Sequence, residues 1–412
     1  MRDYPGGIHH FLPLCQTAKN GSLVSRLTIS STMATPESIS LPDAPSDGIT
    51  HLSYLPPSKN DSLLASTSWD GNLRIHNTQS KALVCNHALD CGPLLALATP
   101  SATAAAASSS SSLSSSSCLW TGGLDGSVRR FHVETSTAEL IGHHSPSIQE
   151  FTTSESESNV ACSCLAPMWN GEHTVASAGW DSNCYIWDAR ASNVAHKGVK
   201  KAVASIPLKD KAYSMDVDPS SGERLVISLA GRQTAFIDVR KLGTVDADTG
   251  MEPVEANIVL ERESSLKYQT RVIRFFPNGS AIATGSIEGR VGIEFLEELK
   301  VDSGGKKKYA FKCHRVGDTV YPVNAIAFHP KYGTFATGGC DGTVVTWDGL
   351  NKKKLVTVSK CATSIAALAF NSDGTELAIA SSYTFEDGER DHPRDEILVR
   401  QVLDSEVRPK SK

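Results

Sequence analysis

Five cationic side chains occur close together within residues 261–315: Lys267, Arg271, Arg290, Lys312 and Arg315. They surround the short sequences S-I-E-G and K-C-H-R, so we expect them at the turns of two joined β-hairpins. Arginine presents a planar fork of donors that matches carboxylate and phosphate groups, and lysine adds a point charge. A buried strand does not need cations at its ends. The stretch therefore predicts a surface that binds acidic or phosphorylated peptides.

Simpler roles are open for the same side chains. Arg271 could only solvate the end of a strand, and Arg290 could only stabilise the turn formed by Glu288 and Gly289. The neighbouring run 306–308 is K-K-K, which is typical of a solvated loop and would also steer an acidic ligand. The number of cations at two adjacent turns favours the binding hypothesis over these alternatives.

A repeated turn organises the rest of the chain. Six four-residue turns occur at intervals of 50 to 57 residues: S-W-D-G at 68, G-L-D-G at 123, G-W-D-S at 179, L-A-G-R at 229, S-I-E-G at 286 and G-C-D-G at 339. Small apolar residues precede each turn, and several of the following strands close on an aromatic residue and Asp, as at Trp187-Asp188 and Trp347-Asp348. Asp-Gly supplies the positive φ angles of a tight hairpin, and four short strands per period are typical of a propeller blade.

These periods predict an all-β, seven-bladed WD40 β-propeller over residues 37–403. A seventh, less regular unit lies at about 355–402, and a strand near Ile39 is expected to complete the last blade, since an open edge invites aggregation. Residues 1–36 are predicted to be an irregular extension, with Met33 as a candidate true start. We expect an Ala/Ser-rich loop insertion at 100–118, a second polar loop at 152–158, and a basic C-terminal tail at 404–412.

Two tryptophans stand at turn tips, and others stand at strand ends. Trp69 and Trp180 each precede a turn Asp, which suits an interface anchor better than a core residue. Trp187 and Trp347 are predicted to be structural. Trp120 is compatible with either role.

Composition excludes several functions. The chain has 412 residues, a net charge of -5 and ten cysteines without a C-x-x-C pair, so a general nucleic-acid binder and a zinc module are both disfavoured. No apolar run is long enough to span a bilayer. The adjacent histidines at 9–10 and 143–144 point to opposite faces of a strand, and catalytic glycine motifs are absent. We therefore expect no enzyme activity, no cofactor, no metal, no direct nucleic-acid contact and no membrane contact.

Several segments resemble one family of WD40 proteins. The sequences R-E-S-S-L-K-Y-Q-T-R, K-K-K-Y-A-F-K-C-H-R, F-A-T-G-G-C-D-G and L-A-I-A-S-S-Y are similar to the WD40 adaptors of the mitotic spindle checkpoint, the budding-uninhibited-by-benzimidazole set. The likeness spans about residues 46–410 and is densest after residue 261. Ala230, in place of an acidic turn residue, and the Ala/Ser insertion depart from the pattern. The mRNA-export propellers of the nuclear pore are close paralogues and share L-K-Y-Q and F-K-C-H-R.

This resemblance implies an adaptor of the spindle assembly checkpoint in the nucleus, at the kinetochore. Its expected partners are a checkpoint kinase and a pseudokinase relative, bound through a GLEBS motif, and a kinetochore scaffold with phosphorylated Met-Glu-Leu-Thr repeats. We expect a monomer within such hetero-complexes. By match to the family's motifs, Arg271, Arg315, Trp69 and Trp180 would bind the GLEBS motif, and Arg290 and Lys312 would bind the phosphothreonine. An mRNA-export adaptor and a generic WD40 scaffold, such as a ubiquitin-ligase receptor, are the alternatives.

Overall fold

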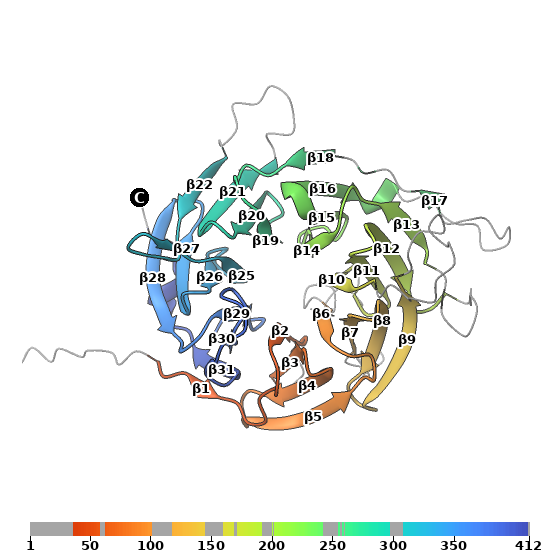
Figure 1. Ribbon diagram of the computed structural model, residues 1–412, viewed down its shortest axis with the longest axis horizontal. Helices are drawn as coiled ribbons and strands as arrows, with labels where there is room; N and C mark the ends of the chain where they lie inside the picture. Colours follow the sequence, from red (N-terminus) through yellow and green to blue (C-terminus); the bar gives the residue numbers. More distant parts are fainter. Residues whose placement is uncertain are drawn as a thin grey trace, which may run out of the picture. The chain divides into compact units, whose positions relative to one another are not determined.

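The computed structural model describes residues 36–57, 62–100, 118–144, 160–168, 171–191, 200, 202–241, 254–255, 258, 260–296 and 308–410. The described part is almost entirely β-structure (Figure 1). The predicted extension before residue 36, residues 101–117 of the Ala/Ser insertion and the loop 152–158 lie outside the described residues. Among the helices described, none is long and apolar enough to cross a membrane.

Seven sheets follow one another around a ring, which confirms the predicted seven-bladed propeller (Figure 1). Blade 1 comprises β2 (Ile49–Tyr54), β3 (Leu63–Ser68), β4 (Asn72–Asn77) and β5 (Ala82–Ala88). Blade 2 comprises β6 (Leu94–Ala98), β7 (Cys118–Gly123), β8 (Ser127–His132) and β9 (Thr137–His143). Blade 3 comprises β10 (Cys162–Pro167), β11 (Thr174–Gly179), β12 (Asn183–Asp188) and β13 (Ala204–Pro207), with β17 (Val254–Glu255) as an added parallel strand.

The remaining blades keep the same order of strands from the centre outward. Blade 4 comprises β14 (Ala212–Val217), β15 (Arg224–Leu229), β16 (Gln233–Asp238) and β18 (Leu260–Glu263), with the 3-10 turns η3 (Ala230–Arg232) and η4 (Val239–Lys241). Blade 5 comprises β19 (Thr270–Phe275), β20 (Ala281–Ser286), β21 (Arg290–Phe295) and β22 (Tyr309–Lys312). Blade 6 comprises β25 (Val323–Phe328), β26 (Phe335–Gly339), β27 (Thr343–Asp348) and β28 (Lys353–Lys360). Blade 7 comprises β29 (Ile365–Phe370), β30 (Glu376–Ser381), β31 (Glu396–Gln401) and β1 (Ile39–Ser40).

The ring is closed by strands from both ends of the propeller. The innermost strands contact each other in one cycle, from β2 through β6, β10, β14, β19, β25 and β29 back to β2. Strand β1 pairs antiparallel with β31, with Ile39 opposite Val399. The strand expected near Ile39 is therefore confirmed, and it covers an edge that would otherwise be open to pairing with another chain.

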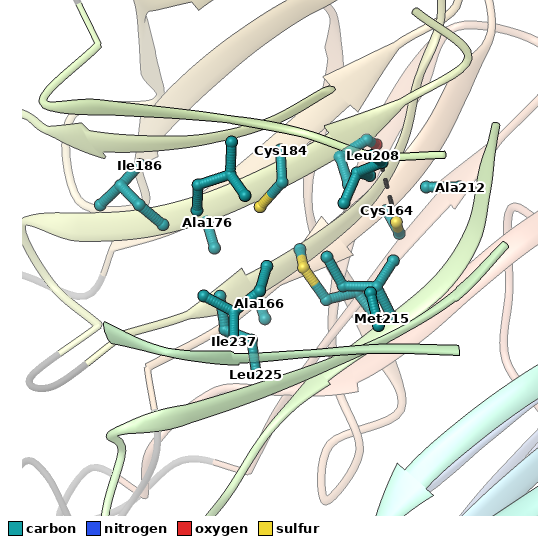
Figure 2. Close-up of a cluster of buried hydrophobic side chains, with 14 of the residues drawn as sticks. Cys164, Ala166, Ala176, Cys184, Ile186, Leu208, Ala212, Met215, Leu225 and Ile237 are labelled. Atoms are coloured by element: carbon teal, nitrogen blue, oxygen red, sulfur yellow. Dashed lines mark hydrogen bonds between the residues drawn. The ribbon is translucent and has the colours of Figure 1, made fainter. Parts of the chain in front are cut away.

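The hydrophobic core lies between the blades rather than at one centre. Seven clusters of buried apolar side chains fill the seven interfaces between neighbouring blades. Figure 2 shows the cluster between blades 3 and 4, where Cys164 and Cys184 face Met215 and Leu225. Because each blade is four short strands wide, it is stable only while both of its faces are covered.

Tryptophans inside the blades tie strands together through hydrogen bonds. Trp187 Nε1 donates to Ser177 Oγ at 2.8 Å, and His144 Nε2 lies 2.8 Å from the same hydroxyl. Trp347 Nε1 and Thr337 Oγ1 repeat this arrangement in blade 6 at 2.9 Å. Both tryptophans are buried, as predicted for structural residues. The ambiguous Trp120 is also fully buried and donates to the carbonyl of Gly171.

The segment predicted as a basic C-terminal tail begins with a short helix that packs against blade 6. Helix α2 (Asp404–Val407) contacts β27 and β28. The buried guanidinium of Arg400 donates from Nη2 to both carboxylate oxygens of Glu406, at 2.8 and 3.0 Å. The hydrophobic Val407 is 2% exposed, so the segment contributes to the folded body.

Candidate peptide-binding face

The six repeated turns all lie at one end of the ring. Each joins the second and third strands of its blade, and the innermost strands run in the same direction around the cycle. We call this end the turn face and define it by residues 68–71, 123–126, 179–182, 229–232, 286–289 and 339–342. In blade 7 the corresponding connection is the longer loop 382–395. A ligand on the turn face can therefore contact several blades at once.

Local hydrogen bonds hold the tips of these turns in shape. In blade 1, Asp70 accepts from the backbone of Asn72 at 3.0 Å and pairs with Arg74 at 2.8 Å. Burial opposes ionisation of this carboxyl, but the bonds from Arg74 and Ser68 outweigh it and lower the pKa of Asp70 below its usual value. Blade 4, where Ala230 replaces the acidic residue, forms η3 instead, with φ of 65° at Gly231.

The cations predicted from the sequence, Lys267, Arg271, Arg290, Lys312 and Arg315, form what we call the cationic cluster. In blade 5 the strand register places Arg290 directly opposite both Ser286 and Lys312. Arg315 begins a small hairpin of β23 (Arg315–Val316) and β24 (Thr319–Val320), which lies beside this turn. The expectation that all five lie in hairpin turns needs correction, since Arg271 is inside β19 and Arg290 and Lys312 are strand ends.

A β-bulge explains how the side chain of Arg271 reaches the turn face. The register between β19 and β20 shifts between Thr270 and Val272, so Arg271 is the extra, unpaired residue. The innermost strand of every blade has the same irregularity at its second residue; the extra residues are Thr50, Leu95, Ser163, Tyr213, Arg271, Asn324 and Ala366. A bulge re-aims its side chain out of the sheet, so the fold displays one residue per blade around the centre of the turn face.

Glu288 organises the cluster around the turn of blade 5. Its Oε2 lies 3.3 Å from Nε of Arg290, and its Oε1 accepts from the backbone of Lys267 at 3.1 Å. Its backbone carbonyl accepts from Nη2 of Arg315 at 2.9 Å. The simpler role of Arg290, stabilising its own turn, is thus present. The Arg290 side chain is still 33% exposed, so it can also contact a ligand.

The cluster contains more positive charge than the surrounding residues neutralise. Arg290 and Lys312 are directly opposite on neighbouring strands, and like charges in that position destabilise a sheet. Among the described residues, Lys312 and Arg271 form neither an ion pair nor a side-chain hydrogen bond, and both are exposed. An anion with several acceptor oxygens would relieve this repulsion.

The predicted aromatic anchors are exposed on the same face. Trp69 is 44% exposed and Trp180 is 36% exposed, in contrast to the three buried tryptophans. The structure places them on blades 1 and 3, away from the cationic cluster, which lies on blade 5 and the β23–β24 hairpin that follows it. Contact with all six predicted residues therefore requires an extended segment that crosses the face.

Sequence reasoning missed several exposed apolar residues at this end of the ring. They are Tyr213, Tyr268, Ile287, Val316 and Phe385. Tyr213 occupies the bulge of blade 4, which is equivalent to Arg271 in blade 5. Two of them could have been found by position, because Ile287 is the second residue of a repeated turn and Tyr213 is the second residue of an innermost strand.

Metal-binding clusters and reactive thiols were also sought in the part of the chain that is described. It contains no cluster of three or more His, Cys, Asp or Glu residues that could hold a metal ion. His144 is engaged with Asp181 inside blade 3, at 3.0 Å. Burial raises the pKa of Cys164 and of Cys313 to about 12, so these thiols are not nucleophilic at neutral pH.

Comparison with known proteins places the chain among WD40 checkpoint proteins. The family model described as WD domain, G-beta repeat matches residues 37–77, 137–188 and 305–348. The mitotic checkpoint protein bub3 of Dictyostelium discoideum is 35% identical over 370 residues, covering 88% of this chain and 94% of that protein. The mitotic checkpoint protein BUB3.1 of Arabidopsis thaliana is 36% identical, covering 90% and 95%.

A second group of relatives is named for a different role. The poly(A)+ RNA export protein of Schizosaccharomyces pombe is 27% identical to this chain, covering 89% of it and 91% of that protein. This lower identity agrees with the paralogue relationship expected from the shared motifs. On the strength of the fold and of the checkpoint relatives, the chain belongs to the Bub3 family of WD40 mitotic checkpoint proteins.

Proposed function

We propose that this protein is a non-enzymatic adaptor of the spindle assembly checkpoint. Its turn face binds the GLEBS motif of a checkpoint kinase and of the pseudokinase relative, and docks them on phosphorylated Met-Glu-Leu-Thr repeats of the kinetochore scaffold. It acts in the nucleus at kinetochores, as a monomer within hetero-complexes. In this arrangement Arg271, Arg315, Trp69 and Trp180 hold the GLEBS motif, and Arg290 and Lys312 hold the phosphothreonine.

The opposed pair Arg290 and Lys312 is the observation that carries the proposal. A phosphothreonine brings nearly two negative charges and three acceptor oxygens, enough to engage a guanidinium and an ammonium together. Arg271 and Arg315 flank that pair and suit the carboxylates of a second, acidic segment. The two ligands would therefore lie side by side on blade 5 and the β23–β24 hairpin.

Recruitment by such an adaptor responds steeply to phosphorylation. Each phosphorylated repeat supplies a modest contact, and many repeats on one scaffold raise the effective concentration of sites. A kinase held by its GLEBS motif is then delivered wherever several repeats are phosphorylated.

A titration with labelled peptides tests the proposal. The phosphorylated Met-Glu-Leu-Thr peptide should bind at least ~10-fold more tightly than the unmodified peptide, since each charge-assisted hydrogen bond contributes about 1.5–3 kcal/mol. Fluorescence anisotropy with and without a GLEBS peptide measures both this preference and any coupling. Equal binding of the two forms would refute the phosphothreonine assignment.

Arg271→Ala should weaken GLEBS-peptide binding ~10-fold or more and leave phosphopeptide binding nearly unchanged, because Arg271 projects from a bulge and has no competing partner among the described residues. Isothermal titration of each peptide measures the effect. Arg240→Ala is the matched control, since Arg240 is exposed at the opposite end of blade 4 and paired with Asp238. An equal loss for both peptides would contradict the division of roles.

The alternative function is that of a nuclear-pore mRNA-export adaptor. It is favoured by the similarity to export proteins over most of the chain. Tight binding of a pore-derived GLEBS peptide, together with indifference to phosphorylation of the Met-Glu-Leu-Thr peptide, would support it.

A further inference from the structure

The loop 382–395 of blade 7 displays a large apolar side chain to solvent. Phe385 is 63% exposed, and its φ of 59° is in the left-handed region that bulky residues avoid. Among the described residues its one ring contact is with Tyr383, at 5.6 Å between ring centres, and most of the side chain stays in solvent.

The loop is nevertheless well built, so the exposure of Phe385 is a defined property of the fold. Tyr383 Oη donates to the carbonyl of Gly388 at 2.8 Å and accepts from the backbone of Asp387 at 3.0 Å. The guanidinium of Arg390 lies 4.6 Å from the centre of the Tyr383 ring and pairs with Asp387 at 3.0 Å. These contacts fix the backbone on both sides of Phe385.

Phe385 belongs to the same area as the exposed Trp69 of blade 1. A Cβ placed on Gly48 would lie 3.4 Å from Cδ1 of Trp69 and 3.9 Å from the carbonyl oxygen of Tyr383. Gly48 thus separates Trp69 from the base of the Phe385 loop. Blades 7 and 1 are neighbours in the ring (Figure 1). Each contributes one exposed aromatic side chain, Phe385 and Trp69.

The charge around these aromatic residues is opposite to that of the cationic cluster. Asp47, Asp387, Glu389 and Asp391 are all exposed near this pair of turns. In the same loop Arg390 is engaged by Glu386 and Asp387, which leaves an excess of negative charge. The turn face therefore has a cationic sector on blade 5 and the β23–β24 hairpin, and an acidic, aromatic sector on blades 7 and 1.

The two sectors are contiguous. Asn324, the bulge residue of blade 6, donates to Thr384 Oγ1 at 3.2 Å and so joins the blade 7 loop to the centre of the face. The Cys340 thiol, in the turn of blade 6, lies 3.3 Å from the same Thr384 hydroxyl, so the blade 7 loop contacts blade 6 at two points. A single extended segment can cross from Arg271 to Phe385 without leaving the surface.

We propose that Phe385 and Trp69 anchor an apolar and basic portion of the same peptide whose acidic portion contacts Arg271 and Arg315 of the cationic cluster. The bound segment is thus oriented by charge, with its carboxylates over blade 5 and the β23–β24 hairpin and its lysine or arginine side chains over blades 7 and 1. The proposal rests on the function above, since it takes an acidic GLEBS-type segment as the occupant, and it adds Phe385 and the direction of binding.

The test uses the full chain and a fluorescent GLEBS peptide of the checkpoint kinase. Phe385→Ala should weaken binding about tenfold, as expected for an aromatic anchor. Val84→Ala is the matched control, because Val84 is 54% exposed but lies on β5, the outer strand of blade 1. The double variant Glu389→Lys and Asp391→Lys should weaken binding at least threefold at low salt, and the loss should shrink as salt is added.

Cross-linking measures the orientation of the bound peptide directly. A photoreactive p-benzoylphenylalanine at position 385 should attach to the portion of the peptide that carries apolar and basic residues. Attachment to the glutamate-bearing portion, an unchanged affinity of Phe385→Ala, or tighter binding by the lysine double variant would each overturn the inference while leaving the proposed function intact. Failure of the unaltered protein to bind the peptide would instead overturn the proposed function, and this inference with it.

Discussion

Arg290→Ala should abolish the preference for a phosphorylated Met-Glu-Leu-Thr peptide and leave GLEBS-peptide binding nearly unchanged. We expect the affinity for the phosphopeptide to fall by ~10- to 100-fold, because a guanidinium contact to a phosphate contributes about 1.5–3 kcal/mol. The unmodified peptide should bind both proteins alike. Anisotropy titration of the two peptides with each protein gives the four affinities needed.

The reason lies in the paired geometry of the site. Arg290 stands opposite Lys312, and its ion pair with Glu288 leaves a third of the side chain exposed. Arg290→Lys keeps the charge but loses the bidentate fork, so it should recover only part of the affinity. Arg190→Ala is the control, since Arg190 is also paired at 2.7 Å with a nearby aspartate but follows β12 at the opposite end of blade 3. If Arg290→Ala weakened binding of the phosphopeptide and of the GLEBS peptide equally, the two ligands would share one site, which would contradict the division of roles.

Glu406→Ala should lower the free energy of unfolding by about 3–5 kcal/mol, because it leaves the guanidinium of Arg400 buried without its counter-charge. Arg400 is 2% exposed and donates to both oxygens of Glu406. The same carboxylate accepts from the backbone of Leu403 at 3.0 Å and so holds the first turn of α2. Urea unfolding followed by tryptophan fluorescence measures the change.

Arg408→Ala provides the comparison within the same segment. Arg408 pairs with Asp404 at 3.6 Å, but both side chains are mostly exposed, so the loss should stay below about 1 kcal/mol. A loss in Glu406→Ala no larger than that of the control would mean that α2 does not contribute to the stability of blade 6.

Much of the propeller follows from local sequence. The Asp-Gly turns have one conformational requirement, a positive φ, which only a few residue types meet, so their repetition can be read directly. Gly71 and Gly342 have φ of 78° and 72°, as a tight turn requires. The strand near Ile39 could also be predicted, because an unpaired edge in a seven-bladed ring needs a partner.

Other features depend on long-range contacts and could not be predicted from the sequence. A β-bulge arises from the register of two strands, and an arginine at position 271 does not predict one. The role of Glu288 as partner of Arg290, Lys267 and Arg315 depends on how hairpin β23–β24 lies against blade 5. Helix α2 is short and polar in sequence, and its packing on blade 6 follows from the buried Arg400 rather than from helix propensity. The roles of the six predicted site residues stay predictions.

The pairing of β1 with β31 joins residues that are synthesised far apart in time. Ile39 is made early, and its partner Val399 leaves the ribosome roughly 360 residues later, about 20–70 s at ordinary rates of synthesis. Throughout that interval strand β1 has no partner. The apolar side chains of blade 1 that pack against blade 7 in the folded protein are also uncovered. The ring can therefore close only after β31 has been synthesised, however early the other blades form.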